Sequence, residues 1–147
     1  MKNHKILVLC TGNSCRSQIA EGFLKHYCKI NNWQAEIYSA GIKAEGVNPL
    51  AIQTMKELGI DISYHTSNKI EDFSDLTFTH ILTVCDHANE SCPVILKKSN
   101  HSHHNFIDPS KKRGSNDYIE HCFRLCREEI KKFVIEYLTS IFTTNQK

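Results

Sequence analysis

Short runs of consecutive apolar residues alternate along this chain with longer stretches in which apolar residues recur every three or four positions. Runs of the first kind are typical of strands buried in a parallel sheet, and stretches of the second kind of helices with one buried face. The pattern predicts strands at Lys5–Leu9, Ala35–Ser39, Thr79–Val84 and Asn105–Ile107. It predicts helices at Ser17–Ile30, Asn48–Leu58 and Asp117–Ile141, and a further short helix capped by Thr66 or Ser67.

The alternation of strands with helices predicts an α/β fold, a parallel sheet covered by helices on both faces. We expect one domain over residues 1–147, since a chain of this length can bury one such core but not two. In parallel sheets the ligand site lies beyond the carboxyl ends of the strands. Cys10 and Cys85 end two of the predicted strands and Asp108 follows the last, so their side chains should share one crevice.

Composition narrows the class of protein. Hydrophobic residues make up 40% of the chain and charged residues 23%, as is typical of globular proteins in water. A formal net charge of +2 is too small to indicate a nucleic-acid partner. No apolar run is long enough for a membrane span or a secretory signal. Seven cysteines, an odd number, favour a reducing compartment, the cytoplasm, over a disulfide framework. No metal or other cofactor is expected.

The segment CTGNSCRS, residues 10–17, joins the first predicted strand to the first predicted helix. Its N–H groups can form an anion-binding nest at the helix N-terminus, and Gly12 permits backbone geometry closed to other residues. Arg16 can grip an oxyanion, and the positive potential should hold the pKa of the nucleophile Cys10 below its ordinary ~8.5. Ser17 can donate its hydroxyl to that thiolate. The predicted oxyanion-binding residues are Thr11, Gly12, Asn13, Ser14, Cys15 and Arg16.

Residues 8–23, VLCTGNSCRSQIAEGF, resemble the phosphate-binding loop shared by the low-molecular-weight protein tyrosine phosphatases and the thioredoxin-coupled arsenate reductases. The resemblance continues through YSAGI, GVNPLAIQTMKELGIDIS, HTS, VCDHANESCP and DP. It covers nearly the whole chain apart from a histidine-rich segment and the C-terminal tail. The fold it implies is a four-stranded parallel sheet flanked by helices, which agrees with the hydrophobic pattern.

Three features favour the reductases over the phosphatases within this resemblance. Cys85 and Cys92 are thiols that a phosphatase does not need. The segment DPSKKRGS, which begins at Asp108, lacks the tandem tyrosines with which these phosphatases line a slot for an aromatic substrate. Gln18 stands where the phosphatases usually have proline and the reductases have glutamine.

The resemblance also implies roles for four residues. Cys10 attacks arsenate while Asp108 protonates the departing oxygen, and the oxidising equivalents pass to Cys85 and then to Cys92. Thioredoxin is the reductant that the resemblance implies. The alternative is a phosphatase that hydrolyses phosphotyrosine or small phosphoesters through a Cys10 phosphoenzyme, and a third reading is a non-enzymatic oxyanion or thiol sensor.

The spacing of Cys85 and Cys92 has a physical consequence. If residues 85–92 are helical, seven steps separate the two Cα atoms by ~10.5 Å. A disulfide tolerates only about 4.4–6.8 Å between Cα atoms. We therefore expect oxidation to unwind or bend this segment, whose interior has no large apolar side chain to anchor it.

The other cysteines are interpreted as structural. Cys15 is expected to contribute its backbone N–H to the oxyanion site, although a protective disulfide with Cys10 is an alternative. Cys28 should pack on its helix. Cys122 and Cys126 share one helix face and are expected to pack at the core boundary rather than bind a metal.

Two polar segments and a candidate cation site are the remaining features of the sequence. The histidine-rich segment 101–104 is expected to be a solvated loop, and Lys111–Arg113 either add positive potential at the crevice or form a solvated turn. Asn13, Glu21 and Ser39 match positions that help bind potassium in some arsenate reductases. Asn68 stands where a further carboxylate is expected, so no cation site is predicted.

Overall fold

Four parallel strands form the centre of the protein. The structure, a computed structural model, describes residues 4–92 and 99–143. Its strands are β1 (His4–Cys10), β2 (Ala35–Gly41), β3 (His80–Thr83) and β4 (Asn100–His103), in the order β2-β1-β3-β4. β1 lies between two neighbours, which explains why Ile6–Leu9 are at most 1% exposed and read as one continuous apolar run.

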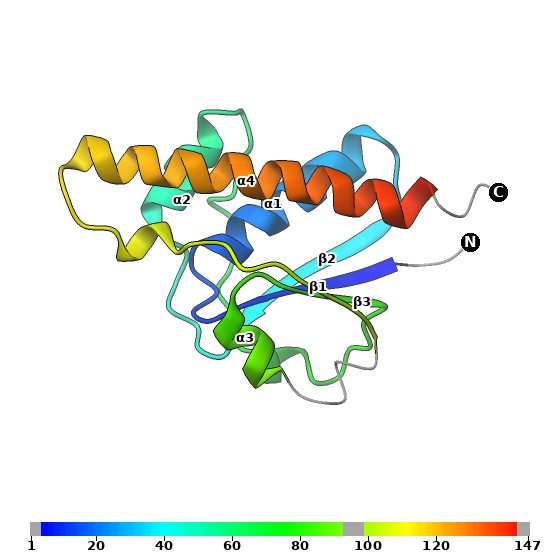
Figure 1. The fold of residues 1–147 in the computed structure, drawn as a ribbon. Helices are drawn as coiled ribbons and strands as arrows, with labels where there is room; N and C mark the ends of the chain where they lie inside the picture. The colour runs from blue at the N-terminus through cyan, green and yellow to red at the C-terminus, as the bar shows by residue number, and fades with distance from the viewer. Residues whose placement is uncertain (1–3, 93–98, 144–147) are drawn as a thin grey trace.

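Four α-helices flank the sheet (Figure 1). They are α1 (Arg16–Ile30), α2 (Pro49–Lys56), α3 (Asp86–Ser91) and α4 (Asn116–Thr143). Helix α1 packs against β1, β2 and α4, and α2 packs against α1 and α4. Helix α3 lies on the other side of the sheet, against β1 and β3. The predicted four-stranded α/β fold is therefore confirmed, and none of the helices within the described ranges is long and apolar enough to cross a membrane.

The start and end of α2 follow the local sequence. Asn48 caps the helix by accepting a 2.8 Å hydrogen bond from the N–H of Leu50, and Pro49 occupies the first helical position. The helix ends at Lys56, two residues before the predicted end. Gly59, at φ +75°, then supplies the left-handed residue that reverses the chain.

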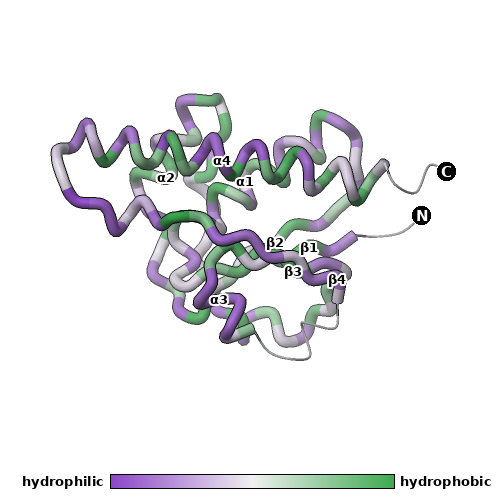
Figure 2. The backbone as a smooth tube through the Cα atoms, in the orientation of Figure 1, coloured by the Kyte–Doolittle hydropathy of each residue, from purple (hydrophilic) through white to green (hydrophobic). Residues whose placement is uncertain are grey.

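The fourth strand is not where the hydrophobic pattern placed it. The strand is Asn100–His103, a polar segment at the edge of the sheet, and not Asn105–Ile107. Its hydrophilic character is visible in Figure 2. An edge strand needs little apolar surface because one side of it faces water. Phe106, only 1% exposed, anchors the following segment to the core, and its N–H bonds the carbonyl of Val84 beyond β3. The histidine-rich segment is thus largely a strand rather than a loop.

Two short elements also differ from the prediction. The helix expected after Thr66 or Ser67 is a 3₁₀ turn, η1, at Ile70–Phe73, and Lys69 precedes it. Ser67 instead donates a 2.9 Å hydrogen bond to the backbone carbonyl of Asn13, in the loop between β1 and α1. Helix α3 was not among the helices that the hydrophobic pattern predicts. Its polar sequence has no helical periodicity, because Ala88 is its one buried residue.

Candidate active site

The loop between β1 and α1 turns its carbonyl groups outward. The carbonyls of Thr11, Gly12 and Ser14 accept hydrogen bonds from the N–H groups of Lys43, Glu45 and Asn48, at 2.9–3.0 Å. The N–H groups of residues 12–15 donate to no other group in the described part of the chain. Helix α1 also begins without a side-chain cap. The loop therefore presents a set of N–H donors at a helix N-terminus, the arrangement that binds tetrahedral oxyanions.

Asn13 is the conformational centre of this loop. Its φ of +46° lies in the left-handed region, so the special backbone geometry belongs to Asn13 and not, as predicted, to Gly12. Its side-chain NH₂ group donates to the hydroxyls of Ser17 (2.8 Å) and Ser39 (2.9 Å). Its side-chain oxygen, Oδ1, accepts a hydrogen bond from the backbone N–H of Asn68 (2.7 Å). Asparagine tolerates this region better than most residues.

Gln18 and Gly41 support the loop from behind. The Gln18 amide donates 3.0 Å hydrogen bonds to the carbonyls of Asn13 and Thr66 and meets the His65 ring at 3.0 Å. A Cβ on Gly41 would lie 2.5–2.8 Å from three backbone atoms, two of them in Thr11 and Asn13. Sequence reasoning missed this requirement for glycine. The sequence feature that could have indicated it is the position of Gly41 at the end of the strand that pairs with the strand ending in Cys10.

Arg16 lies at the first turn of α1, facing the end of the sheet. One terminal nitrogen donates to the carbonyl of Phe106 at 2.9 Å, and the other lies 3.4 Å from the Asp108 carboxylate. Its Nε is a buried donor without a hydrogen-bond partner in the described residues. A buried unpaired donor is costly, and an oxyanion at the loop would satisfy it.

Cys10 and Cys85 meet at the carboxyl ends of β1 and β3 and share a hydrogen bond. This bond raises the pKa of Cys10, as burial also does, although Arg16 acts in the opposite direction. The same bond lowers the pKa of Cys85 to about 5. Because the two groups share a proton, they titrate as a pair that carries one thiolate at neutral pH. The pKa of Cys10 is therefore raised where the sequence predicted a lowered one, and the one thiolate is shared by the pair.

The Cys85 thiolate is stabilised by more than its partner thiol. The hydroxyl of Thr11 lies 3.2 Å from its sulfur, and the N–H of Ala88 donates to it at 3.4 Å. Cys85 is therefore the N-cap of α3, and Cys92 is the residue at its other end. Both cysteines are buried, at 3% and 5% exposure. The sequence contained no signal for the contact with Thr11, which joins two strand ends.

Asp108 lies beside Arg16, as expected of a residue in the same crevice. One carboxylate oxygen accepts from the N–H and hydroxyl of Ser110, at 2.9 and 2.6 Å. The other oxygen faces the guanidinium of Arg16. The carboxyl group is about 20% exposed, so it can exchange a proton with water. Cys10, Cys85 and Asp108 are thus brought together around Arg16.

Ser17 has a different partner from the one predicted, whereas Cys15 agrees with its prediction. The hydroxyl of Ser17 accepts a hydrogen bond from Asn13, and its hydrogen bond in the structure is not to Cys10. Burial raises the pKa of Cys15 well above its ordinary value, so this cysteine is a neutral thiol at neutral pH. That agrees with a contribution through its backbone rather than its sulfur.

The polar side chains behind the loop are paired with one another and with Lys25. The carboxylate of Glu21 accepts a hydrogen bond from Ser39 and forms a 2.6 Å ion pair with Lys25. The side-chain oxygen of Asn13 is bonded to the N–H of Asn68. The Lys25 ammonium thus supplies a positive charge beside the Glu21 carboxylate.

Comparison with known proteins identifies the family. A sequence profile described as low molecular weight phosphotyrosine protein phosphatase matches residues 5–147. The chain belongs to this family. Among curated relatives, arsenate reductases from Halalkalibacterium halodurans and Bacillus subtilis are 44% and 40% identical to it. The alignments cover 90% and 93% of this chain, and 93% and 96% of the respective relatives.

Solved structures of the family have the same fold. An arsenate reductase in its phosphate-binding state aligns with a TM-score of 0.78 and 29% identity, over 94% of this chain and 98% of that one. The low molecular weight protein tyrosine phosphatase from T. tengcongensis aligns with the same TM-score at 21% identity, over 93% of this chain and 99% of that one. The latter likeness concerns the fold alone.

Proposed function

We propose that this protein reduces arsenate to arsenite with a Cys10 nucleophile, and that Cys85 and Cys92 carry the oxidising equivalents to a dithiol reductant such as thioredoxin. The observation that carries this proposal is the hydrogen-bonded pair of Cys10 and Cys85 at the oxyanion loop. A phosphatase has no need of a second thiol at its nucleophile. The names and identities of the curated relatives support the same reaction.

In the first step, arsenate lies in the N–H nest with Arg16 against its oxygens. The proton of Cys10 passes along the shared hydrogen bond to Cys85, and the Cys10 thiolate attacks arsenic. An As–O bond breaks, and Asp108 protonates the departing oxygen, which leaves as water. The product is an arsenic(V) thioester-like adduct on Cys10.

The second step transfers the electrons. Cys85 releases its proton to water and attacks the sulfur of Cys10. The electron pair of the S–As bond moves to arsenic, which leaves as arsenite, while a disulfide joins Cys10 and Cys85. Cys92 then attacks Cys85 and frees Cys10, leaving a disulfide between Cys85 and Cys92. A dithiol reductant supplies the two electrons that reopen it.

Helix α3 is suited to the last exchange because little holds it in place. A helix from Cys85 to Cys92 separates their Cα atoms by ~10.5 Å, so α3 must unwind before the disulfide forms. Only Ala88 buries an apolar side chain, and the Cys85 sulfur caps the first turn. Disulfide formation removes the thiolate that accepts the N–H of Ala88, which weakens that turn at the moment it has to open.

A reducing compartment fits this chemistry. None of the seven cysteines is in a disulfide in the structure. The cytoplasm would keep these thiols reduced and provide the dithiol reductant.

Phosphatase activity is the second candidate, favoured by the family and by the shared oxyanion loop. The same Cys10 can attack phosphorus, and water can then hydrolyse the adduct. The residues that follow Pro109 are exposed and mostly basic and contain no tandem tyrosines. We therefore expect slow hydrolysis of activated phosphoesters and no strong preference for phosphotyrosine.

The experiment distinguishes the proposed roles of the individual thiols. Arsenate-dependent NADPH oxidation is measured with thioredoxin and thioredoxin reductase for the wild type, Cys85→Ser, Cys92→Ser and the control Cys28→Ser. We expect Cys28→Ser to turn over like the wild type. Cys92→Ser should release about one arsenite per chain and stop with Cys10 joined to Cys85, because its final thiol is missing. Cys85→Ser should release none.

Three results would contradict the proposal in different ways. Multiple turnovers by Cys85→Ser and Cys92→Ser would exclude the relay. Fast phosphotyrosine hydrolysis without arsenate turnover would make the protein a phosphatase. Disulfide formation without arsenite release in any variant would indicate an oxyanion or thiol sensor.

A further inference from the structure

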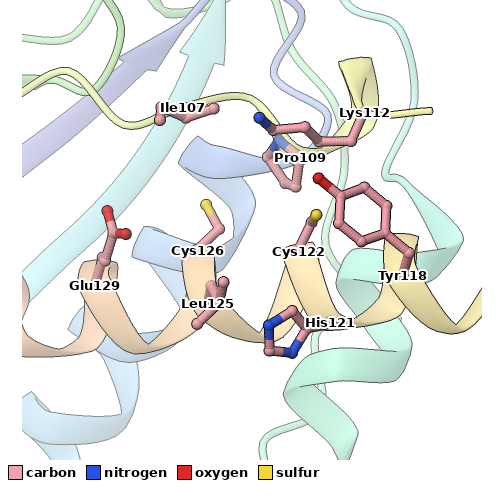
Figure 3. A pocket seen from close by; sticks show the side chains of 9 residues that line it. All are labelled: Ile107, Pro109, Lys112, Tyr118, His121, Cys122, Leu125, Cys126 and Glu129. Carbon is pink, nitrogen blue, oxygen red and sulfur yellow. The ribbon is translucent and has the colours of Figure 1, made fainter. Parts of the chain in front are cut away.

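A cavity of about 280 Å³ lies between α4 and the segment that carries Asp108. Ile107 and Pro109, the two neighbours of Asp108, form one wall, and Cys122 and Cys126 lie on the opposite wall (Figure 3). The nucleophile Cys10 and Arg16 do not line it. The cavity therefore shares no lining residue with the oxyanion site, although the two neighbours of Asp108 belong to its lining. At roughly 30 Å³ per water molecule, it has room for several waters or one small ligand.

The two cysteines of α4 both direct their sulfur atoms into this cavity (Figure 3). They are four residues apart, so their Cβ atoms lie about 5–6 Å apart on one helix face. Their residues are 9% and 6% exposed, and neither has a part in the proposed relay. Core packing alone does not require two thiols that face a cavity rather than filled space.

The side chains that line the cavity restrict the kind of ligand that it can bind. A structural zinc ion needs four ligands, and no group of three or more His, Cys, Asp or Glu side chains among the described residues could hold a metal ion. Two thiols without a third ligand suit a thiophilic centre that takes two sulfurs and keeps an oxygen. The hydroxyl of Tyr118 lies at the same cavity and can face that oxygen (Figure 3).

We propose that this cavity binds arsenite through Cys122 and Cys126. Two S–As bonds form and two As–O bonds break, and the two thiol protons leave with the two oxygens as two molecules of water. Arsenic remains trivalent throughout, so no oxidant or reductant is needed. The third oxygen of arsenite stays on arsenic and faces Tyr118.

The choice of arsenite rests on the proposed function, because the reaction would release this product beside Asp108, whose two neighbours line the cavity. The binding itself requires no turnover. It can therefore be tested in a full-length chain that lacks the relay thiols, Cys10→Ser, Cys85→Ser and Cys92→Ser. If this chain does not bind arsenite, the proposed reduction of arsenate is unaffected. If the wild type does not reduce arsenate, the proposed binding of arsenite by the relay-free chain is unaffected.

The experiment measures retained arsenic. The relay-free chain is reduced with a phosphine, incubated with arsenite and desalted, and arsenic is counted per chain by mass spectrometry. We expect about one arsenic per chain, with two sulfur neighbours in the arsenic X-ray absorption spectrum. Adding Cys122→Ser or Cys126→Ser should reduce retention to the level of a cysteine-free control protein. Adding Cys28→Ser, a buried helical cysteine outside the cavity, should leave it unchanged.

Folding of the variants is checked by far-ultraviolet circular dichroism, and Cys122→Ala and Cys126→Ala provide a second pair without a buried hydroxyl. An independent measurement needs no further variant: bound arsenite should protect Cys122 and Cys126 together from alkylation, but not Cys28. The proposal is overturned if the relay-free chain retains no arsenic, if folded Cys122 and Cys126 variants retain it fully, or if the spectrum shows three sulfur neighbours.

Discussion

Replacing Asn13 with alanine should disable the oxyanion loop, because two properties of the asparagine are needed there at once. Its side chain makes three hydrogen bonds, to Ser17, Ser39 and the N–H of Asn68. Its backbone is in the left-handed region at φ +46°. Alanine removes all three hydrogen bonds and tolerates that backbone conformation poorly.

The magnitude can be worked from these contacts. A buried hydrogen bond contributes about 1 kcal/mol net, so three contribute about 3 kcal/mol. The left-handed conformation costs roughly 1–2 kcal/mol for a residue with a Cβ, and asparagine bears less of this cost than alanine, so the substitution adds about 1 kcal/mol. We therefore expect Asn13→Ala to lower the free energy of unfolding by about 4 kcal/mol, a large share of the ~5–15 kcal/mol typical of a domain.

Asn13→Gly is the matched control, since glycine loses the same hydrogen bonds without the strain. Urea unfolding should place Asn13→Gly below the wild type by about 3 kcal/mol and Asn13→Ala about 1 kcal/mol lower still. Inorganic phosphate should raise the melting temperature of the wild type and of neither variant, because the nest has lost its geometry. The reasoning fails if both variants unfold within 1 kcal/mol of the wild type, or if the glycine variant is the less stable of the two.

Three further predictions concern the thiol pair, the strand behind the loop and a surface ion pair. The rate of alkylation of the Cys10–Cys85 pair by iodoacetamide should rise as the pH passes about 5, the pKa of Cys85, and level off by about pH 7; a rate still climbing tenfold per pH unit above that would mean an ordinary thiol. Gly41→Ala should lower the free energy of unfolding by about 1–3 kcal/mol and abolish the stabilisation by phosphate, because its Cβ would lie 2.5–2.8 Å from backbone atoms; full phosphate stabilisation in this variant would show that the loop can move. Hydrogen bonds from Arg124, and then from Arg127, lower the pKa of Glu57 to about 2. The contribution of the Glu57 carboxylate to the free energy of unfolding is therefore fully present above its ordinary pKa of ~4.3 and is lost as the pH falls through about 2. Glu57→Gln should therefore cost no more than ~1 kcal/mol at neutral pH, since the Glu57 and Arg124 side chains are partly exposed and the buried Arg127 keeps its bonds to Glu128 and the Thr54 carbonyl, and urea unfolding should find the difference shrinking in acid.

Much of the fold could be predicted from the sequence where burial imposes a pattern. Ile6–Leu9 is apolar throughout because β1 has a strand on each side and helices above and below. The helix at α4 is recognisable because one face of it packs on the core over its whole length. Asn100–His103 has no such pattern, because an edge strand pairs through its backbone and leaves its side chains half in water. Its polar residues therefore read as a loop.

The candidate residues of the oxyanion loop could be chosen from the sequence alone, because the nucleophile, the arginine and the N–H donors expected there are eight consecutive residues between a strand and a helix. The conformation of the loop depends also on Ser39, Gly41 and Asn68, which support it from other segments. The state of the thiols depends on residues far apart in the chain. Thr11, Arg16 and Cys10 surround Cys85 only because β1 and β3 are neighbours in the sheet. The shift of a pKa from its ordinary value depends on such a neighbourhood, so only the tertiary structure decided that the Cys10 thiol is paired with Cys85 and shares one thiolate with it.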